Sequence, residues 1–370
     1  MPQLLGNTSS QEQAAVHYAS ESIVSIAIFI IVFIIGIPGN GLVIWVAGLK
    51  MKRSVNIVWF LNLAVADFMC CLSLPFSIVH LALHEHWPYG WFLCKVIPSV
   101  IIFTMFASVF LLMAISIDRC LLVMKPVWCQ NHRTVKFISL VCSGIWILAL
   151  VFCCPVFHYR ETSTYDGKIE CGYNFGDKKV LDYMDDSVND LQDKYSPLAY
   201  SGNDSWEYLY EDYYPLSPAL VAINVTRAVF GFVLPFGIMA VCYALLAFRM
   251  HANQFHKPRN RMSRTIVLVV AAFFICWAPY HVVGILSLVT GTGLTESLIL
   301  WDHLSTALAY VNSCVNPLLY VFVGRDFRAK ARQSVQGILE GVFTEEPTRS
   351  IPYSLDRSKT STEKDTSSTV

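Results

Sequence analysis

Seven runs of about 20 or more apolar residues divide this chain of 370 residues. A run of that length crosses the hydrocarbon layer of a bilayer, which is ~30 Å thick. Only 15% of the residues are charged, against roughly a quarter in an average soluble domain. The runs occupy 23–49, 57–83, 94–124, 135–157, 216–248, 265–289 and 298–323. They predict an all-α integral membrane protein whose residues 23–323 form a bundle of seven transmembrane helices.

The basic residues predict how this bundle is oriented. Lysine and arginine cluster after the first, third, fifth and seventh runs, and basic loops stay on the cytoplasmic side. We therefore expect an extracellular N-terminus at 1–22 and a cytoplasmic C-terminus in the plasma membrane. Glycosylation acceptors at Asn7 and Asn203 fall on the expected outer side, whereas the one at Asn224 falls inside the fifth run and is interpreted as a chance match. No cleavable signal peptide is visible, so we expect the first helix to direct insertion.

The twelve cysteines do not predict a disulfide framework. Nine lie within or at the ends of apolar runs, and Cys129 lies in a short loop that we expect in the cytoplasm. Only Cys94 and Cys171 remain for an oxidising compartment.

The loop at 158–215 is long, acidic and rich in tyrosine. It carries 13 acidic against 5 basic side chains and ten of the seventeen tyrosines. Tyrosines beside acids are predicted sites of sulfation, and here they are Tyr183, Tyr210, Tyr213 and Tyr214. Such a surface raises the local concentration of a basic ligand. The alternative is a solvated loop without a binding role.

Two segments follow the last run. Residues 324–341 place apolar side chains at helical spacing, which predicts a short amphipathic helix on the membrane surface. Residues 342–370 are polar and rich in serine and threonine, so we expect a disordered cytoplasmic tail.

Polar groups and prolines inside the runs form a recognisable series. Buried polar groups at membrane depth are costly and usually functional, and a proline weakens a helix at one point. In chain order the series is Gly39-Asn40, Asp67, Asp118-Arg119-Cys120, Trp146, Pro235 with Tyr243, Cys276-Trp277-Ala278-Pro279 and Asn316-Pro317-Leu318-Leu319-Tyr320. Simple kinks and packing explain any one position but not the joint pattern. The chain resembles the rhodopsin-like class of G-protein-coupled receptors over essentially its whole length.

This resemblance implies a receptor for a heterotrimeric G protein, with no catalytic site. It implies that Arg119 meets the G protein and that Asp118 holds Arg119 in the resting state. Other implied members of the activation switch are Trp277 and Pro279 as a pivot, Tyr243 and Tyr320, which would swing inward on activation, and Asn316 and Pro317. The resemblance also implies a pocket for sodium and water, with no other metal or cofactor, at Asp67, Ser108, Asn312 and Asn316. It pairs Cys94 with Cys171 in a disulfide bond.

Two positions depart from the class. Cys120 stands where most members have tyrosine, a substitution that chemoattractant receptors share. Arg259 stands at the start of the sixth helix, where many members have an acid that holds the switch arginine. We therefore expect basal activity above the class norm, which comparison with an Arg259→Glu variant tests.

Charged residues in the outer halves of the helices predict the kind of ligand. Opsins carry a lysine where this chain has Tyr310, and amine receptors an aspartate where it has Ile101, so retinal and small amines are excluded by resemblance. The predicted ligand-binding residues are Arg160, Arg227, Asp302, His303 and Tyr310. Unpaired charge at this depth requires a charged partner. A peptide ending in arginine fits, with its carboxylate on an arginine and its guanidinium on Asp302. Alternatively, the two arginines pair with lipid phosphates or loop acids.

Four stretches, 45–51, 70–76, 128–133 and 331–340, resemble the chemotactic receptors for complement anaphylatoxins. The resemblance implies as ligand the basic anaphylatoxin of complement component three, and signalling through an inhibitory-type G protein and calcium release in leukocyte chemotaxis and inflammation. A receptor for the component-five anaphylatoxin or for formyl peptides is the closest alternative. Receptor kinases and arrestin are implied partners of the tail, with predicted phosphorylation at Ser350, Thr360, Ser361, Thr366, Ser367 and Ser368. The last three residues also fit a PDZ motif.

Other classes of protein are disfavoured. A transporter or channel is the main alternative, but the helices show no internal repeat. The chain lacks a His-Glu-x-x-His pair and a Gly-x-Ser-x-Gly motif, which disfavours an intramembrane enzyme. A net charge of zero argues against binding to nucleic acid.

Overall fold

The computed structural model describes residues 6–165, 167–175, 217–252, 260–289, 296–323 and 332–333. The chain divides into two units, Met1–Ala331 and Arg332–Val370, and of the second only Arg332 and Gln333 are described, in a helical conformation. Predicted features outside the described residues are Asn203, the four sulfotyrosines, Arg259, most of the surface helix and the tail. The side chains of Asn7 and Tyr320 are also not described, although both lie in helices.

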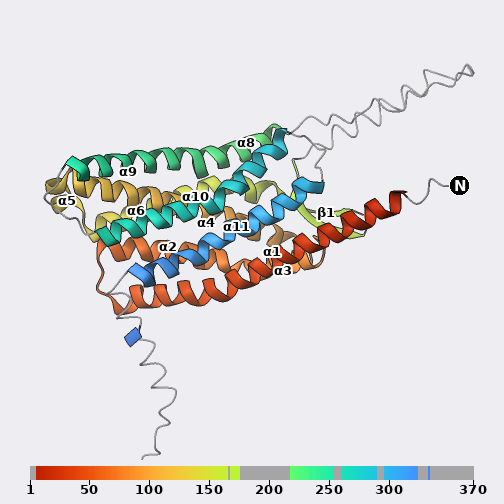
Figure 1. Ribbon diagram of the computed structural model, residues 1–370, viewed down its shortest axis with the longest axis horizontal. Helices are drawn as coiled ribbons and strands as arrows, with labels where there is room; N and C mark the ends of the chain where they lie inside the picture. The colour runs from red at the N-terminus through yellow and green to blue at the C-terminus, as the bar shows by residue number, and fades with distance from the viewer. Residues whose placement is uncertain are drawn as a thin grey trace, which may run out of the picture. The chain divides into compact units, whose positions relative to one another are not determined.

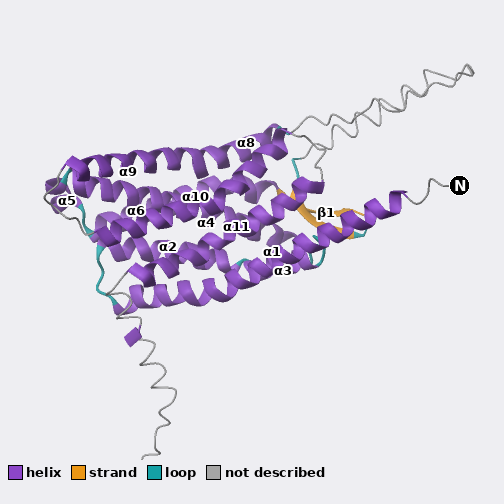
Figure 2. Cartoon of the chain, viewed as in Figure 1, coloured by secondary structure: helices purple, strands orange, loops and turns teal. Residues whose placement is uncertain are grey.

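Helices build the first unit (Figures 1 and 2). They are α1 (Gly6–Trp45) with the π-helical turn η1 (Val46–Lys50), α2 (Val55–Leu72), α3 (Leu74–Ala82), α4 (Gly90–Met124), α5 (Pro126–His132), α6 (Val135–Tyr159), α8 (Pro218–Ala228) with the π-helical turn η2 (Val229–Val233), α9 (Leu234–Ala252), α10 (Asn260–Val289) and α11 (Glu296–Val323). Six spans of the described residues are long and apolar enough to cross a membrane: Ser22–Lys50, Val55–Ala82, Gly90–Met124, Val135–Tyr159, Pro218–Arg249 and Val267–Val289. The 28-residue α11 is the seventh helix of the bundle.

Local sequence explains where several helices begin and bend. The side chains of Ser54 and Thr134 accept hydrogen bonds from backbone N–H groups at the starts of α2 and α6, as N-cap residues do. The second predicted span is divided at Ser73, because Pro75 lies in the first turn of α3 and has no N–H to donate to an uninterrupted helix. Pro235 follows η2 for the same reason, since the missing hydrogen bond loosens the helix into a wider turn.

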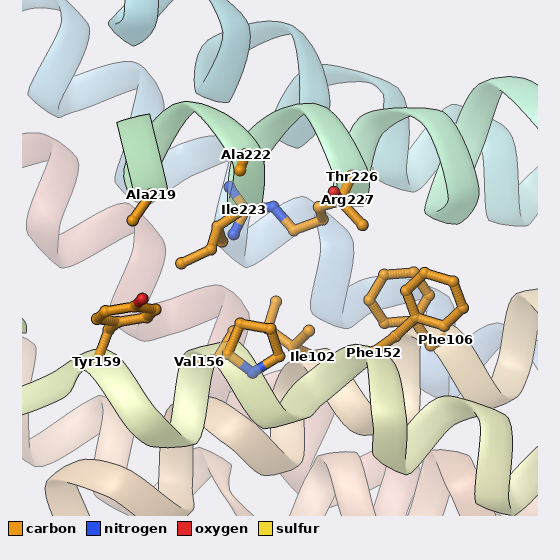
Figure 3. Close-up of a pocket in the computed structure, with 11 residues that line it drawn as sticks. Ile102, Phe106, Phe152, Val156, Tyr159, Ala219, Ala222, Ile223, Thr226 and Arg227 are labelled. Carbon is orange, nitrogen blue, oxygen red and sulfur yellow. The ribbon is translucent and has the colours of Figure 1, made fainter. Parts of the chain in front are cut away.

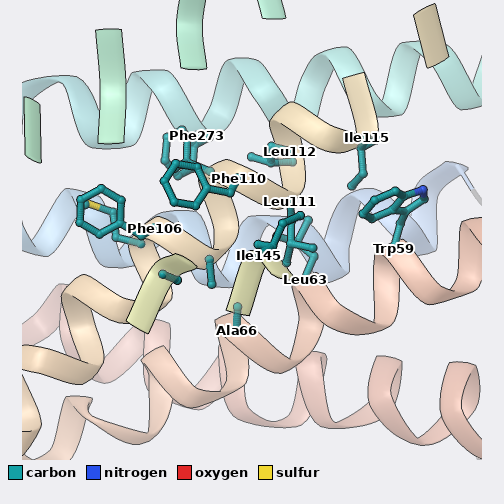
Figure 4. Packing of buried hydrophobic residues seen from close by; sticks show 14 of the residues in the cluster. Trp59, Leu63, Ala66, Phe106, Phe110, Leu111, Leu112, Ile115, Ile145 and Phe273 are labelled. Atoms are coloured by element: carbon teal, nitrogen blue, oxygen red, sulfur yellow. The ribbon is translucent and has the colours of Figure 1, made fainter. Parts of the chain in front are cut away.

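The apolar core is centred on α4, which packs against α2, α6 and α9. Figure 4 shows side chains of α2, α4, α6 and α10 meeting in one cluster, among them Trp59, Leu63, Phe110, Leu111 and Phe273. A second cluster joins α1, α2, α3 and α11. Between α1 and α11 the helices approach so closely that a Cβ on Gly39 would lie 3.2 Å from Pro317. A side chain at position 39 would therefore be tighter than ordinary van der Waals contact and would require Pro317 to shift by a few tenths of an ångström.

A two-stranded antiparallel sheet, which the sequence analysis did not predict, follows α6. Strand β1 (Arg160–Tyr165) pairs with β2 (Lys168–Tyr173), in a register that places Arg160 opposite Tyr173. Figure 1 shows this hairpin at one end of the helices and α5 at the other. We call these the hairpin end and the α5 end of the bundle.

Candidate functional site

The hairpin is fastened over the end of α4. A disulfide joins Cys94 of α4 to Cys171 of β2, with their Cα atoms 5.6 Å apart, which confirms the predicted pairing. The other ten cysteines are free thiols. Next to the disulfide, the Lys95 ammonium donates hydrogen bonds to the backbone oxygens of Arg160, at 2.7 Å, and His158, at 3.2 Å. The buried lysine therefore satisfies carbonyl groups at the end of α6 that the helix leaves unpaired.

The two arginines singled out from the sequence both lie near this end, each against a tyrosine. The Arg160 guanidinium donates to the Cys171 carbonyl at 2.9 Å and stands 4.4 Å from the centre of the Tyr173 ring. Arg227 donates to the Tyr280 hydroxyl at 2.7 Å and to the Asn224 side-chain oxygen, and it stands 4.7 Å from the Tyr280 ring centre. Within the described part of the chain, neither guanidinium forms an ion pair. Their positive charge is therefore available to an anionic ligand.

Asp302 supplies the opposite charge at the same end. Its side chain, near the start of α11, is exposed, and it interacts electrostatically with His303, Arg227 and Arg160. The structure thus brings together the four ionic residues that the sequence analysis grouped. An exposed carboxylate within electrostatic reach of two guanidiniums suits a ligand that carries both signs of charge.

His303 has a partner that the sequence analysis missed. Its Nε2 atom lies 3.0 Å from Oε1 of Glu85, in the turn after α3. Hydrogen bonding to His303 lowers the pKa of the Glu85 carboxyl below its usual range. His84 and Glu85 both have left-handed backbone angles, with φ of 52° and 68°. Such a turn has no periodic sequence signal, so the pair could not be found from spacing.

Tyr310 lies deeper than the ionic residues. Its side chain is only 2% exposed, and its hydroxyl is hydrogen-bonded to Ser73 at 3.0 Å and Ser77 at 3.3 Å. Phe29 packs edge-on against its ring. These contacts tie α11 to α1 and α3, and a contact of Tyr310 with the ligand stays a prediction.

A buried polar cluster lies in the middle of the bundle. Asn316 Nδ2 donates to Asp67 Oδ2 at 2.7 Å, and Asn40 Nδ2 donates to the Ser313 carbonyl at 2.8 Å. The side-chain oxygens of Asn40, Asn312 and Asn316 are buried and have no hydrogen-bond partner among the described residues. Asp67 is 1% exposed and Ser108 is 4% exposed. One buried carboxylate with unsatisfied oxygens nearby is a donor set that fits a hard cation with water.

The predicted pivot of the sixth helix is packed among aromatic rings. Trp277 in α10 is buried and lies against Phe273, Tyr280 and His281, with ring centres 5.9, 5.5 and 6.3 Å away. Two residues further on, Pro279 interrupts the backbone hydrogen bonds of α10. The same helix therefore connects Tyr280, the partner of Arg227, to the Trp277 packing.

At the α5 end, the switch arginine is held differently from the expectation. Arg119 Nε lies 3.8 Å from Asp118 Oδ2, a loose contact, and its Nη2 donates to Asn56 Oδ1 at 2.6 Å. The close partner of Asp118 is Arg133, which follows α5 and donates at 2.6 and 2.9 Å to the two carboxylate oxygens. Arg133 also donates to Asn56 Oδ1 at 2.8 Å. Two arginines therefore share one carboxylate and one amide oxygen.

Tyr243 completes this region from α9, where its hydroxyl accepts a hydrogen bond from Ser116 at 3.3 Å. It also interacts electrostatically with Arg119. The aromatic side chain predicted to move during activation thus already contacts α4. The movement itself stays a prediction, as does that of Tyr320.

Comparison with known proteins identifies this arrangement. The family model described as "7 transmembrane receptor (rhodopsin family)" matches residues 39–186 and 210–320. The chain belongs to the rhodopsin family of seven-transmembrane receptors. It is therefore a multi-pass membrane protein of the plasma membrane, and its family is not a family of enzymes.

Individual relatives of this receptor cover most of its length. The human C3a anaphylatoxin chemotactic receptor is 41% identical over an alignment of 442 residues, covering 89% of this chain and 92% of the relative. The C3a anaphylatoxin chemotactic receptor of Oncorhynchus mykiss is 42% identical over 363 residues, covering 96% and 88%. N-formyl peptide receptor 2 of Gorilla gorilla gorilla is 38% identical over 356 residues, covering 92% and 93%.

Other site residues of this rhodopsin-family receptor were also missed in the sequence analysis. Asn56 joins the switch, and Asn62 accepts a hydrogen bond from Trp146 Nε1 at 2.8 Å. Asn62 lies in the second apolar run and Asn56 directly precedes it, so the rule that polar groups at membrane depth are costly and usually functional applied to Asn62 as well. Arg133 was counted only for its charge, because its contact with Asp118 requires the chain to turn back through α5.

Proposed function

We propose that this rhodopsin-family receptor binds the C3a anaphylatoxin at its hairpin end and activates an inhibitory-type G protein at its α5 end. The hairpin end is then extracellular and the α5 end cytoplasmic. The names of the relatives at 41% and 42% identity support the ligand. The basic residues after the first, third, fifth and seventh helices support the orientation.

One observation carries the ligand proposal, namely the placement of Asp302 with Arg160 and Arg227. A C-terminal arginine carries a guanidinium and a carboxylate on one residue, so it presents both charges that this set requires. Asp302 receives the guanidinium, and one or both arginines receive the carboxylate in charge-assisted hydrogen bonds. Glu85, another acid at this end of the bundle, is already paired with His303.

The proposal extends to signalling. Ligand contact at Arg227 reaches Tyr280 and then Trp277, which share α10. A shift of α10 about Pro279 would open the α5 end, where Arg119 meets the G protein. Receptor kinases acting on the tail and arrestin then end the signal.

The direct test is G-protein activation in cells that express this chain. The C3a anaphylatoxin is expected to activate an inhibitory-type G protein and release calcium, whereas a formyl peptide is not. Activation by the formyl peptide alone would transfer the assignment to a different chemotactic ligand. A ligand-independent current in oocytes would instead indicate a channel.

We further propose that sodium occupies the buried polar cluster and favours the resting state. Asp67 would bind the ion together with Ser108 and the side-chain oxygens of Asn312 and Asn316. These two amide oxygens are buried and have no hydrogen-bond partner among the described residues. A bound cation supplies positive charge that neutralises the Asp67 carboxylate.

Replacing choline chloride with sodium chloride is expected to raise the melting temperature of the purified receptor by ~2–4 °C, for a stabilisation of about 1 kcal/mol. The Asp67→Asn variant is expected to lose this shift, because it lacks the charge that attracts the ion. A Ser22→Ala variant, altered at a buried polar residue of α1 outside the cluster, is the control. An equal shift in Asp67→Asn would exclude the site.

A further inference from the structure

A cavity of about 240 Å³ lies between α4, α6 and α8 near the hairpin end. Figure 3 shows side chains of α4 and α6 on one side of it and side chains of α8, including the Arg227 guanidinium, on the other. Apolar side chains make up most of the wall, and Arg227 is the one charged residue among the described residues that line it. The cavity is thus an apolar space with a positive group at its edge.

The sequence of α8 explains why this space is open. Ala219, Ala222, Ile223 and Thr226 line the cavity, and their spacing of three, four and seven residues places them on one face of the helix. Two of the four are alanines, whose side chains are too short to reach α6. A void therefore remains where larger side chains would have filled the contact between the helices.

The inner end of the cavity is closed by aromatic rings. Phe106 of α4 stacks on Phe152 of α6 with ring centres 4.9 Å apart, and Phe152 contacts Phe230 of η2 at 5.2 Å. An occupant cannot pass further toward the α5 end without displacing Phe106, which belongs to the core, and Phe152, which is packed against it.

The mouth of the cavity faces outward between α6 and α8. Two of its lining residues, Pro155 and Ala222, are exposed. They lie on the same outer surfaces as Val151, which is 60% exposed, and Val225, which is 43% exposed. In a membrane receptor, an exposed apolar helix surface faces acyl chains, so the cavity opens to the bilayer.

Arg227 has hydrogen-bonding capacity to spare. Among the described residues its guanidinium donates hydrogen bonds to Tyr280 and Asn224, whereas a guanidinium has five N–H donors. A carboxylate is the anion whose planar geometry matches the remaining donors.

The volume of the cavity falls below the ~300–1,000 Å³ of pockets that enclose a whole drug-sized ligand. An occupant would therefore leave part of its length in the lipid.

We propose that this cavity binds a single-chain amphiphile with a carboxylate head, such as a long-chain fatty acid, which enters from the bilayer. The carboxylate pairs with Arg227, the first part of the chain lies against Ile102, Phe106 and Val156, and the rest stays among the lipid tails. The proposal does not depend on the C3a assignment, although it shares Arg227 with the proposed peptide site.

The test is photolabelling of the purified full-length receptor in lipid nanodiscs, without any peptide. The probes are palmitic acid with a diazirine in its chain and the matching fatty alcohol. The acid is expected to label α6 and α8 about tenfold more than the alcohol, because only the acid forms charge-assisted hydrogen bonds. Mass spectrometry locates the label, which we expect at Pro155–Tyr159 or Pro218–Arg227.

Four variants give the decisive comparison. Ala222→Trp, which fills the mouth, and Ala219→Leu, a milder filling substitution, are expected to reduce labelling by the acid toward background. Val241→Trp adds the same bulk on an exposed surface of α9, outside the lining of the cavity, and is expected to leave labelling unchanged. Arg227→Gln is expected to remove the preference for acid over alcohol. Equal labelling by acid and alcohol in the unmodified receptor, or full labelling in both filled variants, would overturn the proposal.

Discussion

Replacing Asp302 with asparagine is expected to lower the potency of the C3a anaphylatoxin about 100-fold, the equivalent of roughly 2.7 kcal/mol. The substitution keeps the size of the side chain and removes the charge that would receive the ligand's guanidinium. A charge-assisted hydrogen bond contributes about 1.5–3 kcal/mol, and Asp302 is exposed, so a larger loss is not expected. Concentration–response curves for G-protein activation measure the effect at matched surface expression.

Glu85→Gln is the matched control, because it removes a carboxylate at the same end of the bundle. Glu85 is already bound to His303, so this variant is expected to reduce potency far less than Asp302→Asn does. Equal losses in the two variants would mean that the general negative charge of this surface, and not Asp302, attracts the ligand.

Removing Arg133 is expected to lower basal signalling, although the substitution breaks a buried ion pair. In the structure Arg133 occupies both oxygens of Asp118, and Arg119 stays 3.8 Å away. With glutamine at position 133, the Asp118 carboxylate is free to take Arg119 as its close partner. A gain of about 1–2 kcal/mol in the resting state reduces the active fraction roughly 5- to 30-fold. Nucleotide exchange on the G protein without ligand measures it.

The Asn56→Ala variant is expected to change basal signalling in the opposite direction. It therefore distinguishes this explanation from a general loss of folding or expression. Asn56 accepts hydrogen bonds from both arginines, so its loss is expected to release Arg119 and raise basal exchange. Arg133→Lys keeps the charge and is expected to resemble the unmodified receptor. If Arg133→Gln raised basal exchange instead, Arg133 itself would be the restraint on the switch.

The helices could be predicted from the sequence because each apolar run is long enough to cross the bilayer. The disulfide between Cys94 and Cys171 was implied by the resemblance to rhodopsin-like receptors, and these were also the two cysteines left on the oxidising side. The hairpin was missed although it had a signal. Asp-Gly at 166–167, between stretches that contain threonine, tyrosine and isoleucine, is typical of a two-residue turn between paired strands.

The ionic residues of the site could be predicted, but their partners could not. Three charges stand out near membrane depth, namely Asp302, Arg160 and Arg227. This reasoning needs only the free energy of placing a charge in an apolar environment. The partners depend on how separate helices meet in space. Arg227 binds Tyr280, and Arg133 instead of Arg119 is the close partner of Asp118. Such pairings join residues 53 and 15 positions apart, and no spacing rule connects them.

The most direct test of the central claim is a cycle of two changes read by G-protein activation. The C3a anaphylatoxin is compared with a form that lacks its C-terminal arginine, on the unmodified receptor and on Asp302→Asn. If Asp302 binds that arginine, each single change should reduce potency strongly, and the second change should add little to the first, because both remove the same contact. Fully additive losses would contradict the account, since they would show that the ligand's arginine and Asp302 act at separate places.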